Sequence, residues 1–278
     1  MDNICYNGQI IDTNKFSLSI TNRGFRYGDS FFETIKCYQG NPLFFEEHYF
    51  RMAASFCLMK LTPPDIFDID HFKSLIRDLL MSNNMNQSAR VRISFFRCDG
   101  GYYLPMTNNT HFFIESEVID QHQYILNKTG LRIGVYKDNF LPKNVLGSLK
   151  TNNRLINILA SIYANENNYD DCVLMNESKN LVESISGNIF IVQDGVIKTP
   201  SLEEGCIDGV IRKILINQSS FQVIEKAISF SDILNANELF LTNVISGVKW
   251  IHSINNSIYT NSVAKTVINY LNRYMGLV

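Results

Sequence analysis

Two charged residues in this sequence could do covalent or electrostatic chemistry. Lys150 stands in GSLKTNN, at the start of a predicted helix, where its charge opposes the helix dipole. Most lysines are solvated surface groups, but a lysine amine can also form a Schiff base with a carbonyl cofactor. Glu183 stands in the otherwise apolar segment NLVESISGNIF. It is either a solvated carboxylate on a strand or a partly buried one that needs a cation, such as a protonated pyridine nitrogen.

Other positions could bind a phosphate group. The segment DGVI introduces a helix, in which Asp208 is an ordinary N-cap residue and the backbone N–H groups of Val210 and Ile211 could equally bind an anion. The pair Thr242–Asn243 ends a predicted strand with small polar groups. Arg51 lies on the polar side of a predicted helix. Such an arginine is usually a solvated surface residue, but its planar guanidinium can also form two parallel hydrogen bonds with a phosphate.

These residues would be positioned by strands and helices that alternate irregularly in two blocks. In the first block the residue patterns predict strands at 31–37, 43–45, 89–96 and 111–117 and helices at 46–59 and 71–81. In the second they predict strands at 131–136, 172–175, 181–183, 188–192, 196–197 and 238–242 and helices at 152–165, from about 208, and at 262–275. Without strict βαβ alternation, the pattern favours a mixed α/β (α+β) fold over a doubly wound sheet.

The polar, weakly patterned segment VIDQHQYILNKT at 118–129 is the predicted linker between two domains. Residues 1–117 would form a small N-terminal α/β domain, and residues 130–278 a larger C-terminal domain. A chain of 278 residues is longer than one compact core usually spans, which agrees with two domains.

Composition excludes several classes of function. The chain has 25 Lys plus Arg against 27 Asp plus Glu, a net charge of −2, so it lacks the basic excess of a nucleic-acid binder. No apolar run approaches the roughly 18 residues that a membrane helix needs, and the N-terminus has no secretory signal. Six scattered cysteines and five histidines make no metal-ligand spacing, which favours reduced thiols in a cytoplasmic protein without a metal site.

Taken together and in order, six segments resemble the successive motifs of the class IV aminotransferases, which are pyridoxal 5′-phosphate (PLP) enzymes of fold type IV. The segments are NRGFRYGDSFFETIK at 22–36, EEHYFRM at 46–52, GSLKTNNRL at 147–155, VESISGNIF at 182–190, GCIDGVIR at 205–212 and ELFLTN at 238–243. The resemblance covers essentially the whole chain. It implies a small N-terminal and a larger C-terminal PLP-binding domain, with the cofactor between them, in a homodimer.

The resemblance also implies roles for individual residues. Lys150 would be the Schiff-base lysine and the group that moves the α-proton, and Glu183 would keep the pyridine nitrogen protonated. The cofactor phosphate would be bound by Arg51, by the backbone at Val210 and Ile211, and by Asn243 with Val244.

Within the family, the sequence is more similar to the lyase and D-enzyme branch than to the branched-chain enzymes. Two differences count against a D-amino-acid aminotransferase. Those enzymes have a tyrosine at the position of Phe32, and they have an R-x-H carboxylate clamp where this chain has Arg97 followed by CDGG. The K-x-x-N-R block that begins at Lys150 and the Arg97 loop resemble those of 4-amino-4-deoxychorismate lyase. Phe32, Arg97 and Arg154 are therefore the predicted substrate-binding residues, although Arg97 could be a surface residue and Arg154 purely structural.

The leading hypothesis is a lyase that eliminates pyruvate from aminodeoxychorismate and leaves 4-aminobenzoate. The alternative is a transaminase for branched-chain or D-amino acids, because both reactions use the same cofactor contacts. A non-catalytic PLP-fold protein is a third possibility, which the presence of Lys150 and Glu183 disfavours.

Overall fold

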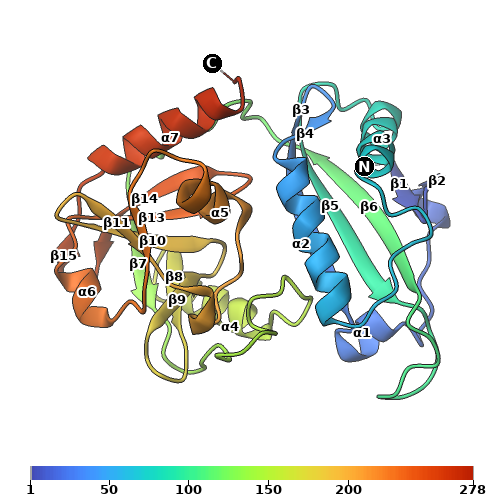
Figure 1. Cartoon of the computed structure of the whole chain (residues 1–278), viewed down its shortest axis with the longest axis horizontal. Coiled ribbons are helices and arrows are strands. Elements are labelled where there is room, and N and C mark those ends of the chain that lie inside the picture. Colours follow the sequence, from blue (N-terminus) through green and yellow to red (C-terminus); the bar gives the residue numbers. More distant parts are fainter. Residues whose placement is uncertain (1, 278) are drawn as a thin grey trace. The chain divides into compact units, whose positions relative to one another are not determined.

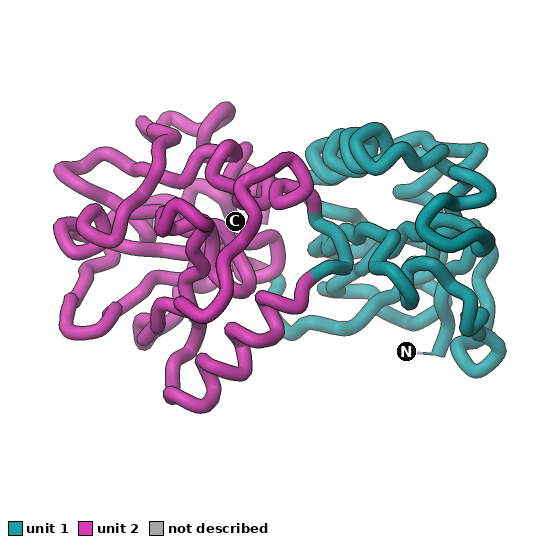
Figure 2. Tube along the Cα trace, turned by 90° about the horizontal axis from the view of Figure 1, so that it is seen from below, with its two compact units in different colours: residues 1–122, 150–153 teal, residues 123–149, 154–278 magenta. Residues whose placement is uncertain are grey.

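The computed structural model describes residues 2–277 of the chain. They form two compact units (Figure 2): unit 1 is the chain up to residue 122 together with 150–153, and unit 2 is 123–149 together with the chain from 154 onward. The segment 150–153, which carries Lys150, therefore packs with unit 1, although its neighbours on both sides belong to unit 2. No helix among the described residues is long and apolar enough to cross a membrane.

Unit 1 is built on an antiparallel sheet of six strands in the order β2-β1-β6-β5-β3-β4 (Figure 1). The strands are β1 (Asn3–Tyr6), β2 (Gln9–Asp12), β3 (Ser30–Tyr38), β4 (Asn41–Pro42), β5 (Ser88–Arg97) and β6 (Thr110–Val118). The helices are α1 (Arg23–Tyr27), α2 (Phe45–Leu58) and α3 (Ile69–Ser82), with a 3-10 turn at Thr13–Lys15. The two long helices and the strands predicted near 31–37, 89–96 and 111–117 are confirmed.

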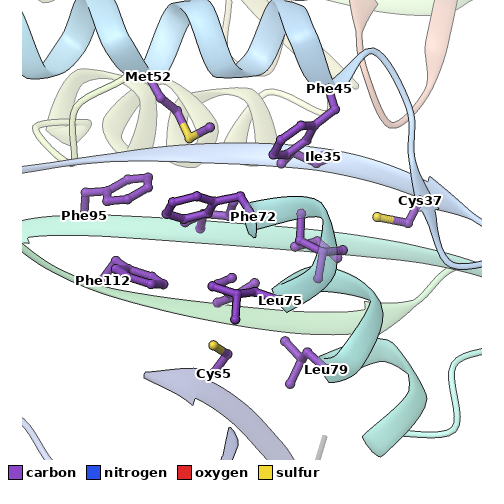
Figure 3. Packing of buried hydrophobic residues seen from close by; sticks show 14 of the residues in the cluster. Cys5, Ile35, Cys37, Phe45, Met52, Phe72, Leu75, Leu79, Phe95 and Phe112 are labelled. Atoms are coloured by element: carbon purple, nitrogen blue, oxygen red, sulfur yellow. The ribbon is translucent and has the colours of Figure 1, made fainter. Parts of the chain in front are cut away.

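The core of unit 1 lies between the sheet and the helices α2 and α3. Phe31 of β3 pairs with Phe95 of β5, and both belong to one apolar cluster with Met52 of α2 and Phe72 of α3. Figure 3 shows the side chains of both helices directed towards these strands. Because successive side chains of a strand point to opposite faces, Phe32 lies on the face of the sheet away from this core.

Unit 2 contains a mixed sheet of nine strands in the order β12-β11-β10-β13-β14-β7-β8-β9, with β15 paired to β14. Its pairs β11–β12, β14–β7 and β7–β8 are parallel and the others antiparallel. The strands are β7 (Leu131–Val135), β8 (Asp171–Met175), β9 (Leu181–Ser184), β10 (Asn188–Gln193), β11 (Val196–Thr199), β12 (Val223–Glu225), β13 (Glu238–Asn243), β14 (Gly247–Ile254) and β15 (Ser257–Ile258). The helices are α4 (Leu155–Glu166), α5 (Val210–Asn217), α6 (Phe230–Leu234) and α7 (Ser262–Tyr274), with a 3-10 turn at Leu202–Glu204.

The helix predicted from residue 152 begins only at Leu155, so the expectation that Lys150 opens a helix is wrong. Thr151 instead forms an antiparallel β-bridge with Phe31. Phe32 N–H donates to the Lys150 carbonyl at 2.9 Å, and Asn152 N–H donates to the Ser30 carbonyl at 3.1 Å. These bonds to β3 satisfy backbone groups that would otherwise enter the first turn of the helix, which explains the later start.

Candidate active site

The Lys150 amine lies over the aromatic ring of Phe32, with Nζ 4.4 Å from the ring centroid. The backbone bonds between the 150–152 segment and β3 bring the two residues together although they are far apart in sequence. Phe32 is only half-buried, so this face of the sheet carries an aromatic surface next to a primary amine. An amine in this position can attack a carbonyl carbon or accept a proton from a ligand that binds over the ring.

A second cation shares that ring. The Arg92 guanidinium carbon is 3.6 Å from the Phe32 centroid, a stacking distance. Arg92 Nη2 donates to Asn152 Oδ1 at 3.2 Å, and its Nε donates to Ser94 Oγ at 3.2 Å. Sequence reasoning missed Arg92, because only the strand register shows that it lies beside Phe32; in β5 the residue opposite Phe32 is Ser94, two positions from Arg92.

Arg51, the predicted phosphate ligand, lies on α2 and makes a bidentate ion pair with Glu33 of β3. Its Nε donates to Glu33 Oε1 at 2.7 Å, and its Nη2 donates to Oε2 at 2.6 Å. Glu33 is only 1% exposed. Burial acts to raise its pKa, but the Arg51 guanidinium and His48 outweigh burial and lower the pKa to about 2, so the carboxyl is ionised at neutral pH.

His48, one turn before Arg51 on α2, completes this cluster. Its Nδ1 lies 2.7 Å from Glu33 Oε2, and the ring is fully buried. Burial lowers the pKa of His48 more than the Glu33 carboxylate raises it, so the ring is neutral at pH 7 and its Nδ1–H donates to the carboxylate. Neither Glu33 nor His48 was predicted; a carboxylate within the otherwise mostly apolar strand SFFETIKCY was the available signal for Glu33.

Arg97, the predicted substrate ligand at the end of β5, is 6% exposed and already makes many hydrogen bonds within unit 1. Its N–H groups donate to the side chains of Asp29 and Asn108 and to the carbonyls of Lys60 and Met59, at 2.6 to 3.0 Å. An arginine has five N–H donors, so only one remains outside these contacts. The structure thus gives Arg97 a strong local role in joining three loops.

In unit 2, the Glu183 carboxylate is held at the end of β9, where it is 3% exposed. Its Oε2 accepts a hydrogen bond from the backbone N–H of Ile207 at 2.9 Å, and its Oε1 lies 3.9 Å from Arg154 Nη1. Asp171 fixes the loop that follows by accepting from the Ile185 backbone N–H at 3.1 Å. Glu183 therefore has a fixed orientation with a rather loose cationic contact.

The start of α5 has the properties of an anion site. Its N-cap is Gly209, and no described side chain caps the first turn, so the N–H groups of Val210 and Ile211 face no capping oxygen. A Cβ at position 209 would come within 1.9 Å of Asn188 Oδ1, which explains why glycine stands there. The predicted helix opening near Asp208 is thus confirmed, and a phosphate would meet backbone donors at its first turn.

The turn after β13 holds the last predicted phosphate ligands. Asn243 Oδ1 accepts from the backbone N–H groups of Ile245 and Ser246 at 3.0 and 2.8 Å, which shapes the turn. Tyr124 donates from its hydroxyl to the Val244 carbonyl at 2.6 Å. Since the Asn243 side-chain oxygen is used locally, backbone groups of this turn are the better candidates for an anion.

Comparison with known proteins identifies the family. A family model described as amino-transferase class IV matches residues 30–254. The chain belongs to the class IV aminotransferases. Members of this family are PLP-dependent aminotransferases or lyases, so the predicted family, the enzyme class and the cofactor are confirmed.

Individual relatives include proteins of both reaction types. A Methanocaldococcus jannaschii protein assigned as a branched-chain-amino-acid aminotransferase is 28% identical over 266 residues, which are 93% of this chain and 90% of that protein. An aminodeoxychorismate lyase of Vibrio harveyi is 26% identical over 234 residues, 81% of this chain and 83% of the lyase. A branched-chain aminotransferase structure from Thermoproteus uzoniensis superimposes with a TM-score of 0.87 at 20% identity, covering 99% of this chain and 95% of that one. The fold is thus fold type IV, as predicted.

The residues of this chain fit PLP. The buried Glu183 carboxylate suits a protonated ring nitrogen, the uncapped start of α5 suits a phosphate, and Lys150 offers an amine to an aldehyde. The assignment of each site residue to an atom of the cofactor stays a prediction.

Proposed function

We propose that the chain is a PLP-dependent lyase that converts aminodeoxychorismate into 4-aminobenzoate and pyruvate. The observation that carries the proposal is the Phe32 ring with Lys150 and Arg92 against it, at 4.4 and 3.6 Å. An unsaturated six-membered ring that bears a carboxylate matches an aromatic surface flanked by an arginine. The 26% identity with the Vibrio harveyi lyase supports the same assignment.

Each of the proposed residues has a defined task. Lys150 binds the cofactor through its amine and then takes the proton from the substrate carbon that bears the amino group. PLP, when bound, supplies an electron sink that stabilises the negative charge left on that carbon. Glu183 holds the proton on the ring nitrogen, while Arg51 and the first turn of α5 bind the phosphate.

Loss of pyruvate follows from the chemistry of the substrate. The electron pair released with the proton forms the aromatic ring and breaks the bond to the enolpyruvyl oxygen. The departing enolpyruvate takes up a proton and becomes pyruvate, so atoms and charge balance without a second substrate. Arg92 and Arg154 would receive carboxylates, whereas Arg97 has only one N–H left outside its local hydrogen bonds for such a group.

A transaminase is the second candidate, favoured by the 28% identity with the Methanocaldococcus jannaschii protein over 93% of the chain. The assay that decides supplies the PLP-loaded protein with aminodeoxychorismate and measures pyruvate in the absence of any 2-oxo acid. Pyruvate release supports the lyase. Absence of pyruvate, together with glutamate formed from 2-oxoglutarate and an amino donor, would show the transaminase instead.

The role of Lys150 has its own test. Lys150→Ala should abolish the visible absorption of bound cofactor, whereas Lys128→Ala, which changes an exposed lysine, should leave the spectrum unchanged. An unchanged spectrum in Lys150→Ala would remove Lys150 from this role. A homodimer in the cytoplasm, expected from the sequence, and the domain boundaries near 117 and 130 remain part of the proposal.

A further inference from the structure

Glu33, His48 and Arg51 form a buried cluster, and the proposed reaction gives a task only to Arg51. Glu33 comes from β3, and the other two come from one face of α2, three residues apart. Glu33 and His48 are 1% and 0% exposed, and the Arg51 side chain is 12% exposed. A carboxylate in such surroundings is costly unless it is fully paired. This cost suggests that the buried ion pair has a function in the protein.

The pairing between Glu33 and Arg51 fixes the plane of the guanidinium. The two carboxylate oxygens take the edge of Arg51 formed by Nε and Nη2, at 2.7 and 2.6 Å. A guanidinium has a second bidentate edge, formed by its two terminal nitrogens, which matches two oxygens of a phosphate. With the first edge bound to Glu33, the direction of the second edge is set.

His48 in turn fixes the carboxylate. Its Nδ1 is 2.7 Å from Glu33 Oε2, the same oxygen that accepts from Arg51 Nη2. Since the buried imidazole is neutral, it orients the carboxylate without adding a cation. Charge within the cluster is then balanced between Glu33 and Arg51.

We infer that Glu33 and His48 are positioning residues that hold the second edge of Arg51 in the orientation for a phosphate monoester. The inference rests on the proposed binding of the cofactor phosphate by Arg51. Preorganisation of this kind strengthens binding because the ordering of a long side chain has already occurred in the free protein.

A competing explanation makes the opposite prediction. If Glu33 only offset the charge of Arg51, its removal would leave a more positive site and would strengthen the binding of an anion. If Glu33 positions Arg51, its removal weakens binding although the site becomes more positive. The sign of the change in affinity therefore separates the two.

The experiment compares the affinity of the apoprotein for PLP with its affinity for pyridoxal, which lacks the phosphate. The ratio of the two affinities, the phosphate preference, is measured by absorbance titration. We expect Glu33→Gln to lower the phosphate preference about tenfold, by analogy with the loss of an outer-shell partner of a metal ligand. Glu46→Gln, the same change at an exposed position of α2, should leave it unchanged. General damage to the fold would weaken both ligands and leave the ratio unaffected.

Arg51→Gln separates failure of the inference from failure of the proposed function. If Arg51→Gln keeps the phosphate preference of the wild type, Arg51 does not bind the phosphate, and the premise fails. If Arg51→Gln lowers the preference but Glu33→Gln keeps or raises it, the premise stands and the positioning role is overturned.

His48 provides a second pair of variants in case Glu33→Gln does not fold. His48→Asn can place an N–H donor where Nδ1 lies, whereas His48→Leu cannot. We expect His48→Leu to lower the phosphate preference and His48→Asn to restore most of it. Equal preferences in the two variants would contradict the role of the His48–Glu33 hydrogen bond.

Discussion

Two buried glutamates, Glu33 in unit 1 and Glu183 in unit 2, have contrasting surroundings. Glu33 meets Arg51 and His48 at 2.6 to 2.7 Å, so side chains of its own unit balance and orient its charge. Glu183 accepts a backbone N–H at 2.9 Å, and its contact with Arg154 is a loose 3.9 Å. The difference agrees with the proposals that Glu33 fixes another side chain of the protein and that Glu183 pairs with the cation of a ligand.

Two arginines of β5 show the same contrast. Arg97 donates to four acceptors within unit 1, whereas Arg92 stacks on Phe32 beside Lys150, makes two longer hydrogen bonds of 3.2 Å and has a 3.9 Å contact with Glu115. A charged group with strong internal partners has little left to offer a ligand. We therefore expect the number of internal hydrogen bonds to separate structural charges from those available for function more clearly than burial alone.

The largest effect is expected from Glu183, the carboxylate proposed to pair with the cofactor. Glu183→Gln keeps an oxygen for the Ile207 N–H but removes the negative charge, so kcat should fall roughly 10²- to 10³-fold. Its unfolding free energy should change by less than about 1 kcal/mol. Steady-state kinetics and urea unfolding measure the two quantities, with the exposed Glu177→Gln as control. A variant with normal kcat would place Glu183 among the structural charges.

For Glu33 we expect a large loss of stability and a small loss of kcat. Glu33→Gln leaves Arg51 without its counter-charge in a buried site, which should lower the unfolding free energy by about 3 kcal/mol. Urea unfolding of the apoprotein at pH 7 measures the change, and Glu46→Gln should stay within about 0.5 kcal/mol of the wild type. With cofactor at saturation, kcat of Glu33→Gln should fall far less than that of Glu183→Gln. Similar losses of kcat in both variants would mean that Glu33 and Glu183 do not differ in the roles proposed here.

Acid should remove the contribution of Glu33 in a defined window. The pKa of this carboxyl is lowered from 4.5 to about 2, because Arg51 and His48 outweigh the effect of burial, which raises it. The folded state therefore binds fewer protons than the unfolded chain between these values, and stability is lost as the pH falls through them. The stability difference between wild type and Glu33→Gln should be constant above about pH 5 and shrink towards pH 2. A difference that does not change with pH would mean that another group carries the effect.

The sequence predicted the parts of this protein that depend on local pattern. The helices α2 and α3 and the strands β3, β5 and β6 follow from apolar spacing, whereas β1 and β2 were missed and the strand predicted at 43–45 is wrong; the helix near Asp208 follows from its Gly-containing start. The six ordered motifs were sufficient for the family. Lys150 and Glu183 could be named as candidate site residues because the motifs contain them.

What the sequence could not show depends on contacts between distant segments. The cluster of Glu33 and Arg51 joins residues 18 apart through the packing of α2 on β3, and no periodicity encodes that pair. The conformation at Lys150 arises from bonds to β3 more than a hundred residues away, so local propensity wrongly favoured a helix. For the same reason the sequence could not show the four hydrogen bonds that Arg97 makes within its own unit, nor the stacking of Arg92 on Phe32.

The smallest effect, and the one that most sharpens the contrast between the two arginines, concerns substrate affinity. Arg92→Gln removes a cation beside Phe32 and Lys150, so KM for a carboxylate-bearing substrate should rise about tenfold, the equivalent of one charged hydrogen bond. Its kcat and unfolding midpoint should change little, since Arg92 has few internal partners. Arg97→Gln should do the reverse, lowering stability by about 2 kcal/mol through the lost contacts to Asp29 and Asn108 while KM stays near normal. If Arg97→Gln instead raised KM at full stability, Arg97 would be the substrate ligand that the sequence suggested, and saturation within the fold would not be a reliable sign of a structural charge.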